Sequence, residues 1–246
     1  MINEQLYALY SNKLNSGFPC VLQQLRQMRR EDNPPAYPLL LKVDEERYNN
    51  ADLKIMVFGQ ETNGWEHRVC STVTPIDQSS EIIDATVKTF MDYYRVFLDG
   101  WGINSPFWHY MKKVKEILSA SLPSETIEIV WNNIYKIGNK EKSRNRPVKS
   151  IRDFENEYFN VIQNEVNILK PDVIIFFTGP NYENRVKKIF PVVSSVPLIS
   201  SIRQEELSKF QLENNILAYR TYHPNYLQLN KKAEYIEYLC SDWLKQ

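Results

Sequence analysis

Four short apolar segments of the chain each end in polar side chains that can move protons or stabilise charge. The residues that follow these segments are Gln60 and Glu61, Asn133, Thr178, and His223. The carboxylate of Glu61 could orient water or stabilise a developing cation, and the imidazole of His223 could stabilise a departing anion. The amide of Asn133 could read a donor–acceptor pair on the leaving group. Each of these residues also has an ordinary interpretation as a loop or cap residue.

The sequence lacks the motifs of several other chemistries. It contains no GxSxG nucleophile elbow, no Walker loop and no GxGxxG fingerprint. The three cysteines lie far apart in the sequence, without a CxxC or Cys/His spacing: they are Cys20, Cys70 and Cys240. One histidine and one carboxylate supply fewer ligands than a metal site usually needs. We therefore expect no cofactor, no metal ion and no iron–sulfur cluster.

The apolar segments alternate with amphipathic ones, which predicts an α/β fold. Strands are expected at residues 53–58, 127–131, 173–177 and 215–222, with an edge strand around 198–201 in an ambiguous region. Helices are expected at residues 3–30, 79–98, 106–119, 150–169, 181–190 and 231–244. This order predicts a three-layer α/β/α fold around a central, mainly parallel four-stranded sheet. We expect a single domain over residues 1–246, in which residues 1–50 form a helical extension packed on a core of residues 51–246.

Composition limits the remaining possibilities. The chain has 246 residues, 43% of them hydrophobic, and its 30 basic and 30 acidic residues give a formal net charge of zero. Net charge therefore does not indicate a nucleic-acid partner, although a local patch could serve one. The start of the chain lacks the pattern of a signal peptide, and no apolar run approaches the roughly 20 residues that a membrane span needs. These features predict a cytoplasmic protein without a membrane partner.

The polar strand ends resemble motifs of the uracil-DNA glycosylase superfamily. Gly59-Gln60-Glu61 is similar to the Gly-Gln-Asp form of the first motif, with the acid lengthened. Tyr222-His223-Pro224-Asn225 is similar to the His-Pro-Ser motif after the last strand. Asn133-Ile134-Tyr135-Lys136, followed by Asn145-Arg146-Pro147, resembles the branch that carries Asn-Val-Val-Lys and a downstream Asn-Arg-x-Pro. The resemblance covers roughly residues 50–245 in order.

The resemblance implies a DNA-repair hydrolase that releases a uracil, or another deaminated or modified base, flipped out of DNA. Glu61 would orient the water and stabilise the oxocarbenium-like sugar, and His223 would hydrogen-bond the departing base anion. Asn133 would pair with the O4 and N3–H of uracil. The residues expected to bind the base are Gln60, Asn133, Thr62, Asn63 and Trp65. Trp65 could equally fill the core.

The chain departs from the superfamily pattern at several positions. Glu61 is one methylene longer than aspartate, which moves the carboxylate by about 1.5 Å. Thr62 and Asn63 replace the proline and the tyrosine or glycine that shape the pocket. Asn225 replaces the serine that grips a DNA phosphate. The cysteines that hold the iron–sulfur cluster of the Asn-Val-Val-Lys branch are absent.

Local positive charge could serve a DNA partner. Basic residues gather between residues 140 and 152, and a solvated basic loop is the alternative interpretation. The residues expected to contact DNA are Lys140, Lys142, Arg144, Arg146, Asn225 and Tyr226. Further basic residues could extend this positive surface as a basic rim near the same sheet edge: Arg185, Lys187, Lys188, Lys231 and Lys232. Tyr226 and Leu227 could wedge into a base stack, or could pack under the final helix.

Two other functions remain open on the sequence alone. The substitutions at Thr62, Asn63 and Asn225 favour a catalytically weak or inactive nucleic-acid-binding protein on the same fold. The neutral net charge favours a hydrolase of free nucleosides or nucleotides.

Overall fold

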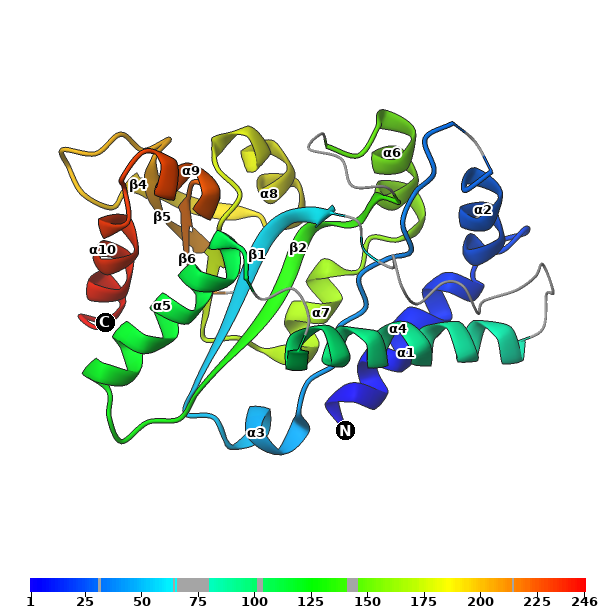
Figure 1. Cartoon of the computed structure of the whole chain (residues 1–246), viewed down its shortest axis with the longest axis horizontal. Helices are drawn as coiled ribbons and strands as arrows, with labels where there is room; N and C mark the ends of the chain where they lie inside the picture. The colour runs from blue at the N-terminus through cyan, green and yellow to red at the C-terminus, as the bar shows by residue number, and fades with distance from the viewer. Residues whose placement is uncertain (31, 64, 66–79, 101–103, 141–145, 214) are drawn as a thin grey trace. The chain divides into compact units, whose positions relative to one another are not determined.

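The computed structural model of the protein describes residues 1–30, 32–63, 65, 80–100, 104–140, 146–213 and 215–246 (Figure 1). In this part of the chain, helices and strands alternate, which confirms the α/β class. The strands are β1 (Leu53–Asn63), β2 (Ile127–Asn139), β3 (Val173–Phe176), β4 (Val192–Pro197), β5 (Leu207–Leu212) and β6 (Leu217–Thr221). The helices are α1 (Ile2–Asn15), α2 (Val21–Met28), α3 (Glu45–Asn50), α4 (Ser80–Gly100), α5 (Pro106–Ser121), α6 (Lys149–Tyr158), α7 (Ile162–Leu169), the short 3-10 helix η1 (Pro180–Tyr182), α8 (Glu183–Ile189), α9 (Pro224–Leu229) and α10 (Glu234–Trp243).

Within the described residues, the strands form one mixed sheet in the order β2-β1-β3-β6-β5-β4. β1, β3 and β6 are parallel, whereas β5 and β4 are antiparallel to their neighbours. The prediction of four mainly parallel strands is therefore wrong, because six strands are present in this part of the chain. β4 is a mostly exposed edge strand of sequence Val-Val-Ser-Ser-Val-Pro, which lacks a long apolar run that would indicate it. The edge strand expected around residues 198–201 is part of the turn between β4 and β5.

The parallel strands lead toward one edge of the sheet. Phe58 of β1 is in register with Phe176 of β3, which is in register with Arg220 of β6. β2 begins beside the start of β1, because the carbonyl of Thr126 accepts a hydrogen bond of 3.1 Å from the amide of Leu53 (Figure 1). β3 is buried along its whole length, as expected for an apolar strand in the interior of a parallel sheet. The carboxyl ends of these strands are where an open α/β sheet presents its ligand groups.

Amphipathic periodicity located most helices. The segment at 3–30 contains α1 and α2, and the segments at 79–98 and 106–119 correspond to α4 and α5. The helix expected at 150–169 is two helices, α6 and α7, because the chain turns at residues 159–161 and buries both Phe159 and Val161 completely. None of the described helices combines the length and the apolar composition that crossing a membrane requires.

Residue contacts divide the chain into two compact units that interleave along the sequence. The first unit comprises Met1–Val43, Glu61–Trp101 and Tyr135–Leu169, and the second comprises Asp44–Gln60, Gly102–Ile134 and Lys170–Gln246. Gln60, Asn133, Thr178 and His223 thus belong to the second unit, and β1 and β2 continue from it into the first. The single domain, with an extension at residues 1–50, stays a prediction.

The first unit has a buried polar network in its interior. The ammonium of Lys136 lies 2.8 Å from the carboxylate of Glu165, and both side chains are fully buried. The hydroxyl of Tyr10 in α1 donates to the same carboxylate at 2.6 Å and accepts a hydrogen bond from the amide of Leu41 at 3.0 Å. The network therefore joins helix α1 and the segment around Leu41 to β2 and α7.

Candidate functional site

The carboxyl edge of the sheet in the second unit gathers several of the predicted residues. Gln60 follows Gly59 in β1, Thr178 comes two residues after β3, and His223 caps helix α9 after β6. The side-chain amide of Gln60 donates a hydrogen bond of 2.9 Å to the carbonyl of Thr178. Gln60 thereby ties the end of β1 to the loop after β3. Thr178 is buried, and its hydroxyl has no hydrogen-bond partner among the described residues.

Asn133 of β2 lies directly against the backbone of Gly59. A Cβ atom added at Gly59 would come within 2.5 Å of Asn133 Oδ1 and 3.2 Å of a ring carbon of Phe107, so only glycine fits there. Asn133 is 2% exposed, and its Oδ1 accepts a hydrogen bond of 3.2 Å from the indole Nε1 of Trp131. Within the part of the chain that the structure describes, the Nδ2 of Asn133 has no partner. The site therefore contains a buried amide donor without a hydrogen-bond partner in the described part of the chain.

His223 is held in one tautomer at the start of α9. Its Nδ1 accepts a hydrogen bond of 3.2 Å from the backbone amide of Asn225, so the neutral imidazole carries its proton on Nε2. Its ring stacks on Phe107 of α5, with centroids 5.9 Å apart and planes inclined by 26°. Burial lowers the pKa of His223 to about 4. At neutral pH the side chain is thus an uncharged hydrogen-bond donor through Nε2.

Glu61 is the next residue of β1 after Gln60 and is half-buried. Glu61 belongs to the first unit, whereas Gln60 belongs to the second. Thr62 is buried against β2, where a Cβ atom on Gly138 would come within 2.5 Å of the Thr62 hydroxyl. Asn63 is the last residue of β1. The catalytic role of Glu61 and the base-binding roles of Thr62 and Asn63 stay predictions.

Trp65 lies in an aromatic cluster of the first unit. It is 4% exposed, and its ring centroid lies 4.7 Å from that of Tyr93 and 5.3 Å from that of Phe97, both in α4. This contact with two rings of α4 favours the core alternative for Trp65 over stacking on a base.

The basic residues expected to face DNA have different surroundings. Lys140 is exposed and Arg146 is half-buried, whereas Lys142 and Arg144 lie outside the described residues. Arg185 does not extend a basic rim, because it is 7% exposed and its Nε donates to the carbonyl of Ile134 at 3.2 Å. Two other rim lysines form ion pairs: Lys187 with Glu183, and Lys232 with Glu206. Lys188 and Lys231 are placed at the surface of the second unit.

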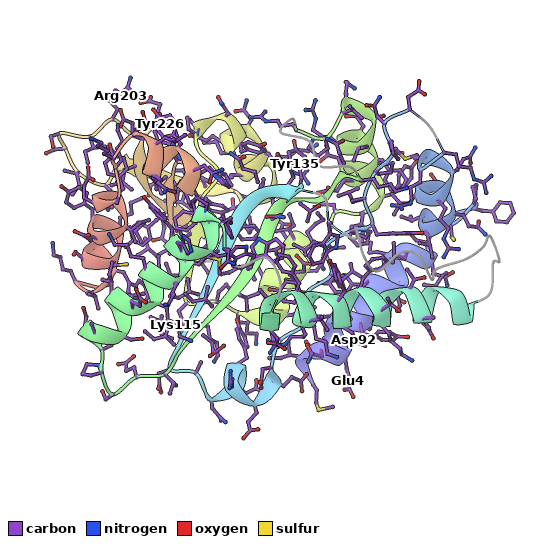
Figure 2. The ribbon with its side chains drawn as sticks, in the orientation of Figure 1. Glu4, Asp92, Lys115, Tyr135, Arg203 and Tyr226 are labelled. Atoms are coloured by element: carbon purple, nitrogen blue, oxygen red, sulfur yellow. The ribbon has the colours of Figure 1, made fainter. Side chains whose placement is uncertain are left out.

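The first residues of α9 place one aromatic side chain at the surface beside the histidine. Tyr226, labelled in Figure 2, is 40% exposed and stacks on Tyr222 with a centroid separation of 4.1 Å. Leu227 is fully buried and so does not wedge into a base stack. Asn225 is exposed, and its backbone amide holds the His223 ring.

Two residues of this edge were missed from the sequence. Trp131 hydrogen-bonds Asn133, and its position two residues earlier in the same strand was a usable signal, because such residues share a face of the sheet. Phe107 packs on His223, but the sequence around it indicates only a helix start with Pro106 at its first position. The chain brings it to the site through the packing of α5, which contacts α9 and α10.

Among the described residues, no group of three or more histidine, cysteine, aspartate or glutamate side chains is arranged to hold a metal ion. The groups gathered at the edge are instead hydrogen-bond donors and acceptors. A comparison of the sequence with models of known protein families found no match, and neither did a comparison with curated proteins. The function of the chain is therefore inferred from its own residues and their geometry.

Proposed function

We propose that the chain is a DNA base glycosylase of uracil type, which hydrolyses the N-glycosidic bond of a uracil or another deaminated or modified base flipped out of DNA. The observation that carries the proposal is one sheet edge with two fixed donors: the Nε2–H of neutral His223 and the buried Nδ2 of Asn133. A flipped base needs both recognition of its edge and stabilisation of the charge that it acquires on leaving.

The two donors fit the two needs of this reaction. When the bond between C1′ and the base nitrogen breaks, the electron pair stays on the base, and water adds to C1′. His223 would donate from Nε2 to the carbonyl oxygen that takes up this negative charge, as a neutral imidazole can. Asn133 would donate to a second carbonyl on the base edge. Phe107, which contacts the His223 ring and lies next to Gly59, would keep this part of the site dry.

Glu61 would supply the negative group of the reaction. It immediately follows Gln60, whose side chain is anchored to the carbonyl of Thr178. The carboxylate would orient the attacking water and stabilise the positive charge that develops on the sugar. The base, once released, takes up a proton, and the DNA keeps an abasic site.

The fold and the DNA contacts belong to the same proposal. The order of the strands, with the Gly-Gln-Glu motif in β1, the Asn-x-x-Lys motif in β2 and the His-Pro motif after β6, supports a uracil-DNA glycosylase-like, three-layer α/β/α arrangement. Asn225 and Tyr226, exposed at the start of α9 beside His223, would contact the strand that carries the base. Lys140 and Arg146 would add phosphate contacts, together with Lys142 and Arg144, which lie between them in the sequence.

The activity is tested with single- and double-stranded oligonucleotides that contain one uracil, hypoxanthine or xanthine. Alkali after incubation cleaves the strand at any abasic site. We expect strand cleavage by the wild type, and a loss of at least a hundredfold in both Glu61→Ala and His223→Ala. His109→Ala and Glu125→Ala are the matched controls, because both residues are exposed elsewhere, and these variants should cleave like the wild type.

Each alternative has its own result. Tight binding of uracil-containing DNA without cleavage by the wild type would refute the glycosylase proposal and favour a binding protein. Release of uracil from deoxyuridine, with no action on DNA, would identify a hydrolase of free nucleosides.

A further inference from the structure

The side chains of Trp131 and Asn133 form a fixed pair on one face of β2. Both are buried, at 6% and 2% exposure, and the indole Nε1 lies 3.2 Å from Asn133 Oδ1. Residues two apart in a strand point to the same side of the sheet, so the pairing follows directly from their spacing.

The pair has only one favourable orientation. An indole N–H is a donor and never an acceptor, so the amide atom that faces it has to be the oxygen. Rotating the Asn133 amide by half a turn would set its NH₂ group against the indole N–H, two donors in a buried place. Gly59 confines the oxygen further, because even a Cβ atom there would approach it to 2.5 Å. The Asn133 NH₂ group is thereby turned away from Trp131.

Aromatic packing supports the indole. Trp108 of α5 packs edge-on against Trp131, with centroids 5.0 Å apart and planes inclined by 75°. Phe107 packs against Trp108 at 5.3 Å and against His223 at 5.9 Å. The same cluster of rings therefore contacts both the residue that orients Asn133 and the residue that would face the departing base.

We propose that Trp131 is a positioning residue, which fixes the orientation of the Asn133 amide so that its NH₂ group donates to the base. This inference rests on the proposed glycosylase function and names a residue that acts on the base through Asn133. Deamination converts an exocyclic amine, a donor, into a carbonyl, an acceptor. The fixed NH₂ group of Asn133 hydrogen-bonds such a carbonyl and opposes an amino group, because two donors then face each other without water.

The test compares the wild type with Trp131→Phe, which keeps an aromatic ring but removes the N–H donor together with part of the ring system. The measured quantity is the rate of release of uracil relative to cytosine from otherwise identical single-stranded oligonucleotides. We expect the uracil-to-cytosine ratio to fall about tenfold in the variant, since one buried hydrogen bond no longer sets the amide orientation. Trp108→Phe is the matched control: it perturbs the same ring cluster, has no bond to Asn133 and should keep the ratio. An unchanged ratio in Trp131→Phe, with uracil still released by the wild type, would overturn the role of Trp131 and leave the glycosylase function standing.

A second measurement tests the orientation of the Asn133 amide and does not depend on enzymatic activity. In ¹⁵N spectra of the free protein, the Trp131 indole proton should exchange slowly with deuterated water, and the Asn133 side-chain amide should give one pair of signals. In Trp131→Phe, but not in Trp108→Phe, the Asn133 pair should double or broaden as both orientations are populated. Rapid exchange of the indole proton in the wild type, or a single Asn133 pair in Trp131→Phe, would refute the proposal even in a protein that releases no base.

Discussion

The imidazole of His223 acts as a neutral donor only while its Nδ1 accepts from Asn225 and its ring stays packed on Phe107. Burial lowers the pKa of His223 to about 4, so we expect the neutral form to persist through the mildly acidic range. Uracil release should therefore show no inflection between pH 6 and 7 that belongs to this histidine. A fall toward low pH should have its midpoint near the lowered pKa. The check is a pH–rate profile under single-turnover conditions, with His109→Ala as the control; a midpoint near 6.5 would contradict it.

The same pKa shift predicts a pH-dependent stability. Because the folded pKa of His223 lies below the unfolded value of about 6.5, the unfolded chain binds the extra proton first as the pH falls. The contribution of the neutral histidine is present above pH 6.5 and is lost as the pH falls through the folded pKa. Urea unfolding at pH 7 and pH 5 should show that His223→Gln loses less stability on acidification than the wild type, by at most about 2 kcal/mol. Equal losses would show that the imidazole is not buried in solution.

Gly59 is the residue at which one added methyl group should reach Asn133 and Phe107. In Gly59→Ala the new Cβ atom would lie 2.5 Å from Asn133 Oδ1, so the amide or the strand has to move. We expect a loss of about 1–3 kcal/mol in the free energy of unfolding, and weaker binding of uracil-containing DNA. Gly100→Ala is the matched control, since a Cβ atom there meets nothing within 4 Å. Denaturant titrations of the two variants check the difference, and equal stability would contradict it.

At the scale of elements, apolar content decided what the sequence could predict. β3 is a continuous apolar run and lies within one residue of its predicted bounds. β1 begins at the predicted residue but continues five residues beyond the predicted end, to Asn63, because its last part is polar. β4 is exposed on most positions and is recognised as a strand only through its ladder with β5, a contact that a local pattern does not contain. The same reason explains the candidate residues: His223 and Asn133 follow apolar runs, so the sequence indicates them, whereas Phe107 reaches His223 only through helix packing.

The buried pair of Lys136 and Glu165 connects elements of the first unit that are distant in sequence. Desolvation lowers the pKa of Lys136, and the nearby carboxylate of Glu165 offsets part of that shift. Lys136→Met leaves the Glu165 carboxylate buried with one cation fewer, which we expect to cost about 3–5 kcal/mol of unfolding free energy. Lys42→Met is the control, because its pair with Asp92 is exposed and should contribute about 0–1 kcal/mol.

A double-mutant cycle makes that prediction specific. Lys136→Met combined with Glu165→Leu should be less destabilising than Lys136→Met alone, because the second change removes the uncompensated carboxylate. Denaturant unfolding of the four proteins measures the coupling. Additive losses would mean that the two groups do not interact, in spite of their separation of 2.8 Å.

At the scale of the whole molecule, each unit is made of three separate segments of the chain, so no single point in the sequence separates one unit from the other. The first 43 residues belong to the first unit together with the last part of β2. The amide of Ala36 donates to the carbonyl of Gly138 at 2.8 Å, and the amide of Leu39 donates to the carbonyl of Lys136 at 2.8 Å. The sequence alone predicts residues 1–50 to be an extension, because no motif lies in them. Their role becomes visible only in the backbone pairing with β2.

This pairing predicts the result of a deletion. A chain that lacks residues 1–30 loses α1 and α2, with their buried leucines, and removes the Tyr10 hydroxyl from the Glu165 carboxylate. Because each of these four buried leucines is worth about 1.5–3 kcal/mol, their loss is comparable with the roughly 5–15 kcal/mol that keeps a domain folded. We expect no cooperative thermal transition of the first unit by circular dichroism, and rapid proteolysis within residues 135–169. A chain that lacks only the exposed residues 245–246 is the control and should melt like the wild type. Cooperative melting of the shortened chain at the wild-type temperature would show that residues 1–30 are an appendage to the fold and not part of its core.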